Sequence, residues 1–296
     1  MQINPQKETN FDVCIVGTGV AGLTVARELL PKGVRICFIE SGGEDYDHDQ
    51  QQLNDAENIG FDYYKIIDAR LRIYGGTTAI WGGRCAPLDA IDFEKREWVP
   101  FSGWPIAPSD LEKPYRKARE MLGLPKFGVQ EDEERQQREN FYQMNQSGFE
   151  VTRWEFDSKH DRFQVHNTTD VRHHPQSTLL LKSTVTKINV DEKNGQRMTS
   201  VTILNNHGEK LNIYAQRFVL ATGGLENPRI LLNSNEYHKN GLGNAKGLVG
   251  KFFMEHPRVR GGTIKTKKPL AILRACYKME KVNGVQTVSL VRPTDQ

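Results

Sequence analysis

The stretch FDVCIVGTGVAGLTVARELL, residues 11–30, decides the fold. Residues 11–16 form an apolar, β-prone run, and residues 20–30 carry the apolar spacing of a helix. The motif GTGVAG at residues 17–22 is a G-x-G-x-x-G that closes the strand and opens the helix. This context gives the pattern its meaning, so the sequence predicts a strand, a glycine turn and a helix in that order.

Each position of the glycine motif has its own role in binding a dinucleotide. Gly17 permits the tight turn, Gly19 lets the backbone approach a pyrophosphate, and Gly22 lets the helix pack on the strand. The start of the helix, at Val20 and Ala21, offers free N–H groups to the phosphates. A glycine turn without a ligand is the alternative, but the motif, its flanks and the acid described next all favour a bound dinucleotide.

A second apolar run follows the helix and ends at an acidic residue. Val34 to Ile39 is the run, and Gly33 before it is well placed to end the helix. Neither run alternates between apolar and polar residues, so both suit the interior of a parallel sheet that is covered on both faces. Glu40 and the adjacent Ser41 stand where a carboxylate accepts hydrogen bonds from an adenosine ribose. An acid here fits an unphosphorylated 2′-hydroxyl and disfavours NADP.

The regions that follow distinguish between two kinds of dinucleotide. A nicotinamide domain usually continues with alternating strands and helices. This chain has a polar, structureless stretch at 42–58, a glycine-rich segment at 74–83 and a β meander that leads into Ala221-Thr222-Gly223. That order is typical of FAD-binding proteins. The elements expected in the later part are strands at Thr178–Val190, Met198–Leu204, Leu211–Tyr214 and Phe218–Thr222 and a helix at Glu226–Leu232.

Composition excludes several other classes of protein. The formal charge of +3 is spread over 40 basic and 37 acidic side chains, so no single-sign field attracts nucleic acid or anionic lipid. The N-terminus shows no secretory signal pattern and no apolar stretch is long enough to span a bilayer, which favours the cytoplasm without membrane insertion. Four separated cysteines, Cys14, Cys37, Cys85 and Cys276, are expected to be free thiols, and no metal site is predicted.

Four segments make the chain resemble FAD-dependent glucose-methanol-choline (GMC) oxidoreductases. RIYGGTTAIWGGR at 72–84 is similar to the segment that this family places beside the flavin ring. SGWPI at 102–106, ATGGLENPR at 221–229 and VGKFFMEHP at 249–257 also resemble family segments. The combination is closest in kind to the N-terminal part of bacterial sugar and polyol dehydrogenases, including pyranose-oxidase-like proteins.

The resemblance implies an α/β fold with a Rossmann-like FAD-binding domain, in which a parallel sheet is combined with an antiparallel β meander. The FAD-binding domain is expected to be discontinuous, with residues 1–95 and 178–260. Residues 96–177 are expected to form an inserted, lid-like segment on the substrate side. Residues 261–296 are expected to begin a truncated substrate domain.

The physical properties of the glycine-rich segment agree with a place beside a flavin. Gly75 and Gly76 let the main chain lie flat against a planar ring, and the neighbouring threonines add hydroxyl and N–H groups. Trp81 either walls the ring or fills core, and the glycines after Thr222 either approach the pyrophosphate or only pack. Beyond the residues named above, the resemblance implies cofactor binding by Arg72, Gly75, Gly76, Thr77, Thr78, Trp81, Gly82, Val185, Ala221, Thr222 and Gly223.

Two departures from the family change what is expected of this chain. Pyranose oxidases carry a flavin-linking histidine where this chain has Ile80, and isoleucine cannot form that bond, so FAD should be held noncovalently. The family's catalytic histidine, paired with another histidine or an asparagine, lies near the end of a longer chain, and nothing after Pro257 resembles it. No catalytic residue is therefore identified, and His256 is the remaining candidate for the base. The chain is expected to stop before the catalytic segment.

The function implied by the resemblance is oxidation of a CH–OH group of a sugar, polyol or other alcohol, with hydride passing to flavin N5. The reduced flavin would pass its electrons to a quinone, an electron-acceptor subunit or oxygen. The main alternative is a catalytically inactive flavin-binding remnant, or a subunit that needs a partner chain. A second alternative, an NAD-dependent dehydrogenase, is disfavoured by the flavin-ring segment.

Overall fold

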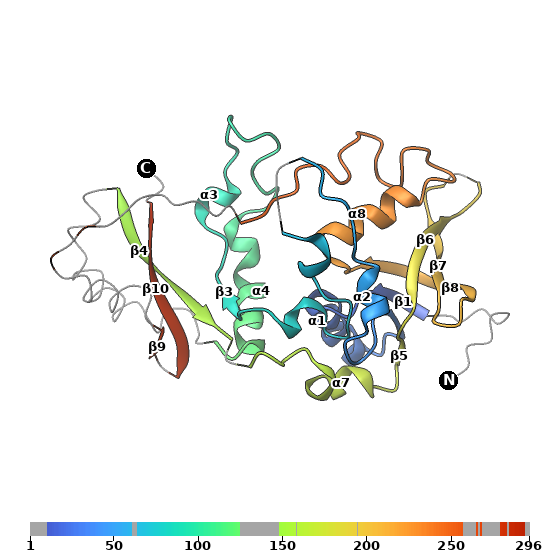
Figure 1. Cartoon of the computed structure of the whole chain (residues 1–296), viewed down its shortest axis with the longest axis horizontal. Coiled ribbons are helices and arrows are strands. Elements are labelled where there is room, and N and C mark those ends of the chain that lie inside the picture. The colour runs from blue at the N-terminus through green and yellow to red at the C-terminus, as the bar shows by residue number, and fades with distance from the viewer. Residues whose placement is uncertain are drawn as a thin grey trace. The chain divides into compact units, whose positions relative to one another are not determined.

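The computed structural model describes residues 11–60, 64–124, 148–157, 159–193, 195–256, 265, 267, 279–282 and 284–293. Contacts within the chain divide it into two compact units. The first unit combines Met1–Ile80 with Asp161–Arg258, and the second combines Trp81–His160 with Val259–Gln296. Each unit is therefore assembled from two separate stretches of sequence (Figure 1).

A six-stranded sheet in the order β5-β2-β1-β8-β7-β6 forms the first unit. Strand β1 pairs in parallel with β2 and β8, and β2 pairs in parallel with β5. Strands β6, β7 and β8 pair antiparallel. The predicted α/β class, with a parallel sheet and a β meander, is confirmed. The strands are β1 (Phe11–Val16), β2 (Ile36–Ile39), β5 (Ser177–Leu180), β6 (Thr184–Val190), β7 (Met198–Leu204) and β8 (Lys210–Leu220).

Two strand predictions at the junction of parallel and antiparallel pairing are wrong. The expected single strand at Thr178–Val190 is two strands, because the chain turns at Lys182, which has a φ of 49°. The expected pair of strands at Leu211–Tyr214 and Phe218–Thr222 is one strand, β8. Residues 210–214 of β8 pair with β7 and residues 215–220 pair with β1, so one strand belongs to both kinds of sheet.

Two helices of the first unit, α1 and α8, directly follow strands β1 and β8 of this sheet. Helix α1 confirms the prediction from the sequence and follows β1 directly. The stretch predicted as structureless contains a short helix, α2, because the side chain of Asp47 accepts hydrogen bonds from the backbone N–H groups of Asp49 and Gln50. The helical elements are α1 (Val20–Leu29), η1 (Leu30–Lys32), α2 (His48–Gln52), η2 (Ile66–Asp68), η3 (Gly76–Ala79), η4 (Val165–Asn167), α7 (Thr169–Arg172) and α8 (Gly223–Asn233).

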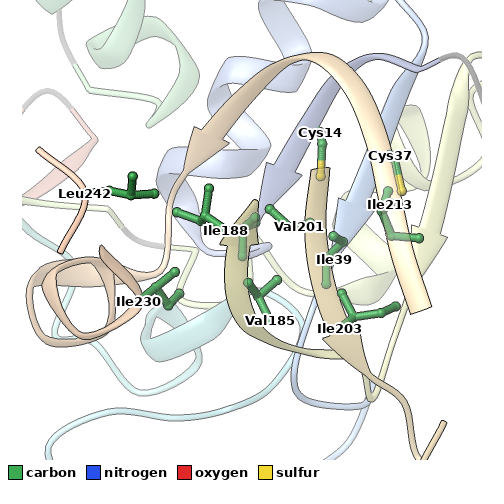
Figure 2. Packing of buried hydrophobic residues seen from close by; sticks show 11 residues of the cluster. Cys14, Cys37, Ile39, Val185, Ile188, Val201, Ile203, Ile213, Ile230 and Leu242 are labelled. Carbon is green, nitrogen blue, oxygen red and sulfur yellow. The ribbon is translucent and has the colours of Figure 1, made fainter. Parts of the chain in front are cut away.

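Strand β1 is buried on both faces, which explains its unbroken apolar sequence. Helix α1 packs on the face of β1 that carries Ile15. Gly22 of α1 is at this contact, where a Cβ atom would lie 3.1 Å from Cγ2 of Ile15. Successive strand residues point to opposite faces, so Cys14 and Val16 point the other way. There they join a buried cluster with the meander strands and Ile230 of α8 (Figure 2). The core therefore lies between the parallel strands and the meander.

The cysteines agree with the expectation of free thiols where the structure describes them. Cys14 and Cys37 are fully buried in neighbouring strands, and Cys85 is partly buried. Cys276 lies outside the described residues.

The second unit contains a four-stranded antiparallel sheet in the order β3-β4-β10-β9. Strands β4 and β10 pair along residues 149–156 and 286–293, so the expected insert and the expected start of a substrate domain share one sheet. On α4, Arg119 donates two hydrogen bonds to the carboxylate of Glu155, at 2.5 and 2.8 Å. The elements are β3 (Arg84–Cys85), α3 (Ala90–Phe93), α4 (Pro108–Met121), β4 (Phe149–Phe156), β9 (Met279–Val282) and β10 (Val285–Pro293).

The boundaries between the units fall at residues 80 and 161, whereas the sequence predicted boundaries near 95 and 178. Residues 161–176 belong with the first unit because they hold the glycine-rich segment of that unit. The hydroxyl of Tyr74, which is almost fully buried, donates to Oγ1 of Thr168 at 3.0 Å. The backbone oxygen of Phe163 would lie 2.6 Å from a Cβ atom at Gly75.

Candidate cofactor site

A pocket of about 580 Å³ opens at the carboxyl ends of the parallel strands. The last residues of β1, β2 and β8, which are Val16, Ile39 and Leu220, all line it. All of its lining residues belong to the first unit. Its volume is in the range of cofactor sites, and ligands of open α/β sheets bind at this edge.

Three glycine segments meet backbone to backbone at this pocket. Gly19 and Gly75 form an isolated β-bridge, and the N–H of Gly75 donates to the backbone oxygen of Thr18 at 3.1 Å. A Cβ atom at Gly76 would lie 3.2 Å from Cα of Gly19. Gly17 has a φ of 98°, and a Cβ atom there would lie 2.6 Å from the backbone oxygen of Ala221. Side chains at Gly17 and Gly76 would therefore separate the segments.

The glycines of the G-x-G-x-x-G motif have different surroundings. A Cβ atom at Gly22 would lie 2.2 Å from the backbone oxygen of Gly17, so Gly22 serves helix packing. Gly19 has an ordinary φ of −69°, and a Cβ atom there would meet nothing within 4 Å. Neither backbone strain nor packing explains a glycine at position 19. Because residue 19 has no side chain, the space beside the N-terminus of α1 stays open to the pocket.

Glu40 is a buried carboxylate that organises the turn after β1. Its Oε2 accepts hydrogen bonds from the backbone N–H and the hydroxyl of Thr18, at 2.9 and 2.8 Å. Its Oε1 accepts from the backbone N–H of Gly42 at 2.8 Å. Each carboxylate oxygen keeps further acceptor capacity, and Glu40 lines the pocket, so it can also accept ribose hydroxyls.

Arg72 connects the glycine-rich segment to the end of β2. Its Nη1 donates to Oγ of Ser41, and its Nε donates to Oδ1 of Asn54, both at 2.8 Å. The Ser41 hydroxyl also contacts the hydroxyl of Thr184 at 2.8 Å. Arg72 thus fixes the wall of the pocket near Glu40.

A buried carboxylate on α8 gathers three arginines at the pocket. Glu226 forms ion pairs with Arg70 at 2.7 Å, Arg72 at 3.2 Å and Arg229 at 2.6 Å. Burial alone would raise the pKa of Glu226, but the charge of Arg72 and the hydrogen bonds from Arg229 and Arg70 outweigh it and lower that pKa. Burial is also the largest influence on Arg72, whose pKa is lowered. Sequence reasoning missed Arg70, Glu226 and Arg229.

Most of the sequence-predicted site residues gather at this pocket. Gly22 is not on the pocket lining and packs α1 on β1, which is the role that the motif predicted for it. Trp81 and Gly82 belong to the second unit and remain predictions. The predicted residues that line the pocket are Gly17, Gly19, Val20, Ala21, Glu40, Ser41, Arg72, Gly75, Gly76, Thr77, Thr78, Val185, Ala221, Thr222 and Gly223.

The candidate base does not face the pocket. The side chain of His256 is 97% exposed, and its Nδ1 lies 2.9 Å from the carboxylate of Glu255. Within the part of the chain that the structure describes, no histidine lines the pocket.

In the same part, no group of three or more histidine, cysteine, aspartate or glutamate side chains is arranged to hold a metal. No described helix has the length and apolar character needed to cross a bilayer.

Comparison with known protein families identifies two matches. The model described as GMC oxidoreductase matches residues 93–258, which is more than half of the chain. The model described as FAD binding domain matches residues 10–59, which contain β1, α1, β2 and Glu40.

Individual relatives are more distant. The 2-methyl-1,2-propanediol dehydrogenase of Mycolicibacterium austroafricanum is 24% identical over 87% of this chain and 57% of its own length. The fructose dehydrogenase large subunit of Gluconobacter japonicus is 28% identical over 31% of this chain and 16% of its own length. Among solved structures, pyridoxine 4-oxidase from Mesorbium loti has a TM-score of 0.49 at 22% identity, covering 76% of this chain and 52% of that chain. The chain spans little more than half the length of the relatives that it matches most fully.

Proposed function

Because the chain belongs to the GMC oxidoreductase family, we propose that it forms the cofactor-binding part of an FAD-dependent enzyme that oxidises a CH–OH group of a sugar, polyol or other alcohol. The observation that carries this proposal is the pocket at which three glycine segments meet beside the N-terminus of α1. The names of two relatives, a fructose dehydrogenase and a diol dehydrogenase, support the class of substrate.

The residues at the pocket fit the adenosine diphosphate half of FAD. The open space at Gly19 admits a phosphate against the first N–H groups of α1. Glu40, held in place by its bonds to Thr18 and Gly42, accepts the ribose hydroxyls. Val185 of β6 is on the lining where the adenine is expected to meet backbone groups.

When bound, FAD supplies an acceptor for the hydride that leaves the substrate carbon. The chain's own part is to hold the flavin in place and to shape its surroundings. Gly75, Gly76, Thr77 and Thr78 form the segment proposed to lie beside the ring. Ile80 offers no atom for a covalent link, so the cofactor is proposed to be held noncovalently.

The base that removes the hydroxyl proton is proposed to come from outside the described residues. A base must come within about 3 Å of the proton that it takes, and none of the described histidines lines the pocket. One relative is the large subunit of a fructose dehydrogenase, which supports a multi-subunit enzyme in which another subunit or a quinone accepts the electrons. The same observations favour a second candidate function, a flavin-binding subunit that is inactive without its partner.

A comparison of two preparations tests this proposal. The FAD-loaded chain, alone and co-expressed with the coding region that follows its last codon, is mixed anaerobically with fructose, other sugars, polyols and simple alcohols. The flavin of the chain alone should stay oxidised, and the flavin of the co-expressed preparation should bleach, with dithionite as the control that the flavin can be reduced. Bleaching of the chain alone at an enzymatic rate would place the base among the present residues, with His256 the first to replace. Failure of both preparations to bleach would contradict the alcohol-oxidising function.

A further inference from the structure

The Glu226 cluster, which consists of Arg70, Arg72, Glu226 and Arg229, holds more positive than negative charge. Three guanidinium groups share one carboxylate, so two positive charges remain without a carboxylate in the cluster. All four residues line the pocket. The other charged residues of its lining are Glu40 and Glu255, both acidic, so the excess positive charge is confined to the cluster.

The cluster also keeps hydrogen-bond donors that the protein does not use. Nε of Arg70 is buried and has no partner within the described residues, although Arg70 donates to Glu226 and to the backbone oxygen of Ile66. Arg229 donates its Nε to Glu226 at 2.6 Å, and no partner of its two terminal nitrogens is found among the described residues. Glu226 therefore orients two guanidinium groups, and the remaining hydrogens of their terminal nitrogens, rather than the buried Nε of Arg70, can serve a ligand.

Helix α8 adds backbone donors at the same place. The helix has eleven residues and begins at Gly223, and Cβ atoms at Gly223 and Gly224 would meet nothing within 4 Å. Both glycines line the pocket, so the first turn of α8, like that of α1, is open to it. The first N–H groups of a helix have no partner within the helix.

The diphosphate of the cofactor needs more positive charge than the N-terminus of α1 supplies. The N-terminus of α1 carries no charged side chain in its first turn and offers only the partial charge of a helix end, about half an elementary charge. The diphosphate of FAD carries two negative charges. A helix N-terminus alone leaves most of that charge unmatched, and the two unmatched positive charges of the cluster lie on the same pocket.

We propose that Arg70 and Arg229, oriented by Glu226, bind the diphosphate group of FAD together with the first turns of α1 and α8. This inference rests on the proposed function, because it assigns the ligand of the same pocket. Arg72, whose donors already reach Ser41, Asn54 and Glu226, contributes charge and positions the other two.

The electrostatics within the cluster agree with this role. Burial is the largest influence on the pKa of Arg72 and lowers it; the charge of Glu226 raises that pKa, and the neighbouring charges of Arg70 and Arg229 lower it. Three like charges are thus held close together around one carboxylate. A dianion bound at the cluster relieves that repulsion, whereas a purely structural cluster would gain nothing from it.

The test measures the dissociation constants of FAD, ADP and adenosine for the parent chain, Arg229→Gln and Arg70→Gln. Each substitution should weaken FAD and ADP by about 10- to 100-fold, the effect of a lost charge-assisted hydrogen bond, and leave adenosine unchanged. Arg229→Lys should recover part of the loss, and added salt should weaken FAD less in the glutamine variants than in the parent. Arg27→Gln is the matched control, since Arg27 is an ion-paired, partly buried arginine of the same unit and lies outside the pocket lining.

The possible outcomes separate this inference from the proposed function. Parent-like FAD and ADP binding by both glutamine variants would overturn the diphosphate site and leave the FAD assignment intact. An equal loss for ADP and adenosine, together with a lower melting temperature, would show a structural role and also overturn it. If the parent chain bound ADP in a way that depends on Arg229 but did not bind FAD, the anion site would stand and the proposed function would be contradicted.

Discussion

The N-termini of α1 and α8 differ in how they prepare the same pocket. Each helix follows the end of a parallel strand and begins beside a glycine. At α1, Gly19 forms a backbone bridge with Gly75, Gly17 lies against the backbone of Ala221, and one carboxylate, that of Glu40, holds the turn through Thr18. At α8, Glu226 holds arginines from two separate segments. One end is built mainly from backbone contacts between glycine segments, and the other from charged side chains that meet only in the folded chain.

The largest effect is expected at α1, where two glycines of one motif should respond in opposite ways. Gly19→Val should abolish FAD binding and leave the melting temperature near that of the parent, because its side chain enters only the open space of the pocket. Gly22→Val should instead prevent stable folding, since a Cβ atom there would meet the backbone of Gly17 at 2.2 Å. FAD fluorescence quenching and thermal unfolding measure the two effects. Parent-like FAD binding by Gly19→Val would break the phosphate assignment at α1.

At α8, replacing the central carboxylate should affect stability first. Glu226→Gln leaves three buried or half-buried arginines without their anion, so it should lower the free energy of unfolding by about 3 to 5 kcal/mol. Glu236→Gln is the control, because Glu236 forms an exposed ion pair with Lys187 and such pairs contribute at most about 1 kcal/mol. Urea unfolding at neutral pH compares them. Equal losses in the two variants would show that the Glu226 cluster does not hold α8 in place.

The pH dependence sharpens the same contrast. The folded chain lowers the pKa of Glu226 below its usual value of 4.5, so this carboxylate stabilises the fold above that value. Its contribution should be lost as the pH falls through the lowered pKa. The difference in unfolding free energy between the parent and Glu226→Gln should therefore shrink as the pH falls below about 4.5. A difference that grows on acidification would contradict the ion-paired state of Glu226.

Glu40 should have a smaller effect that is measured on the cofactor. Glu40→Ala should weaken FAD by about 1.5 to 3 kcal/mol, the range for a lost hydrogen bond to a charged group. Because the carboxylate also holds Thr18 and Gly42, part of this loss reflects the turn rather than the ribose. Glu40→Gln, which keeps the shape of the side chain, should retain more affinity than Glu40→Ala. Unchanged FAD affinity in both variants would remove Glu40 from the site.

The smallest effect is expected where the glycine-rich segment is anchored. Tyr74→Phe removes the buried hydrogen bond to Thr168 and should lower the unfolding free energy by about 1 kcal/mol. Tyr214→Phe, at a half-exposed position of β8, is the control and should change stability little. Equal stabilities would show that residues near Thr168 do not hold this segment.

The same contrast explains what could be predicted from the sequence. The strand, glycine turn and helix at 11–30 could be predicted because each step depends on residues close together in the chain. The ion pairs of Glu226 could not, because Arg70 and Arg72 lie more than 150 positions away and no local spacing links them. The strand break at Lys182 was also missed, since a positive φ at a lysine has no signal in an apolar, β-prone run. The boundary at 161 depends on long-range contacts such as the one between Tyr74 and Thr168.

The measurement that tests the account most directly is to load the purified chain with FAD, remove free cofactor by gel filtration and denature the protein with acid. The pocket described here should retain FAD through the filtration and release all of it, yellow and unmodified, into the supernatant. Protein that emerges colourless from the filtration, with no FAD after denaturation, would contradict the claim that the three glycine segments form an FAD site. Colour that stays on the precipitate would contradict the noncovalent attachment argued from Ile80.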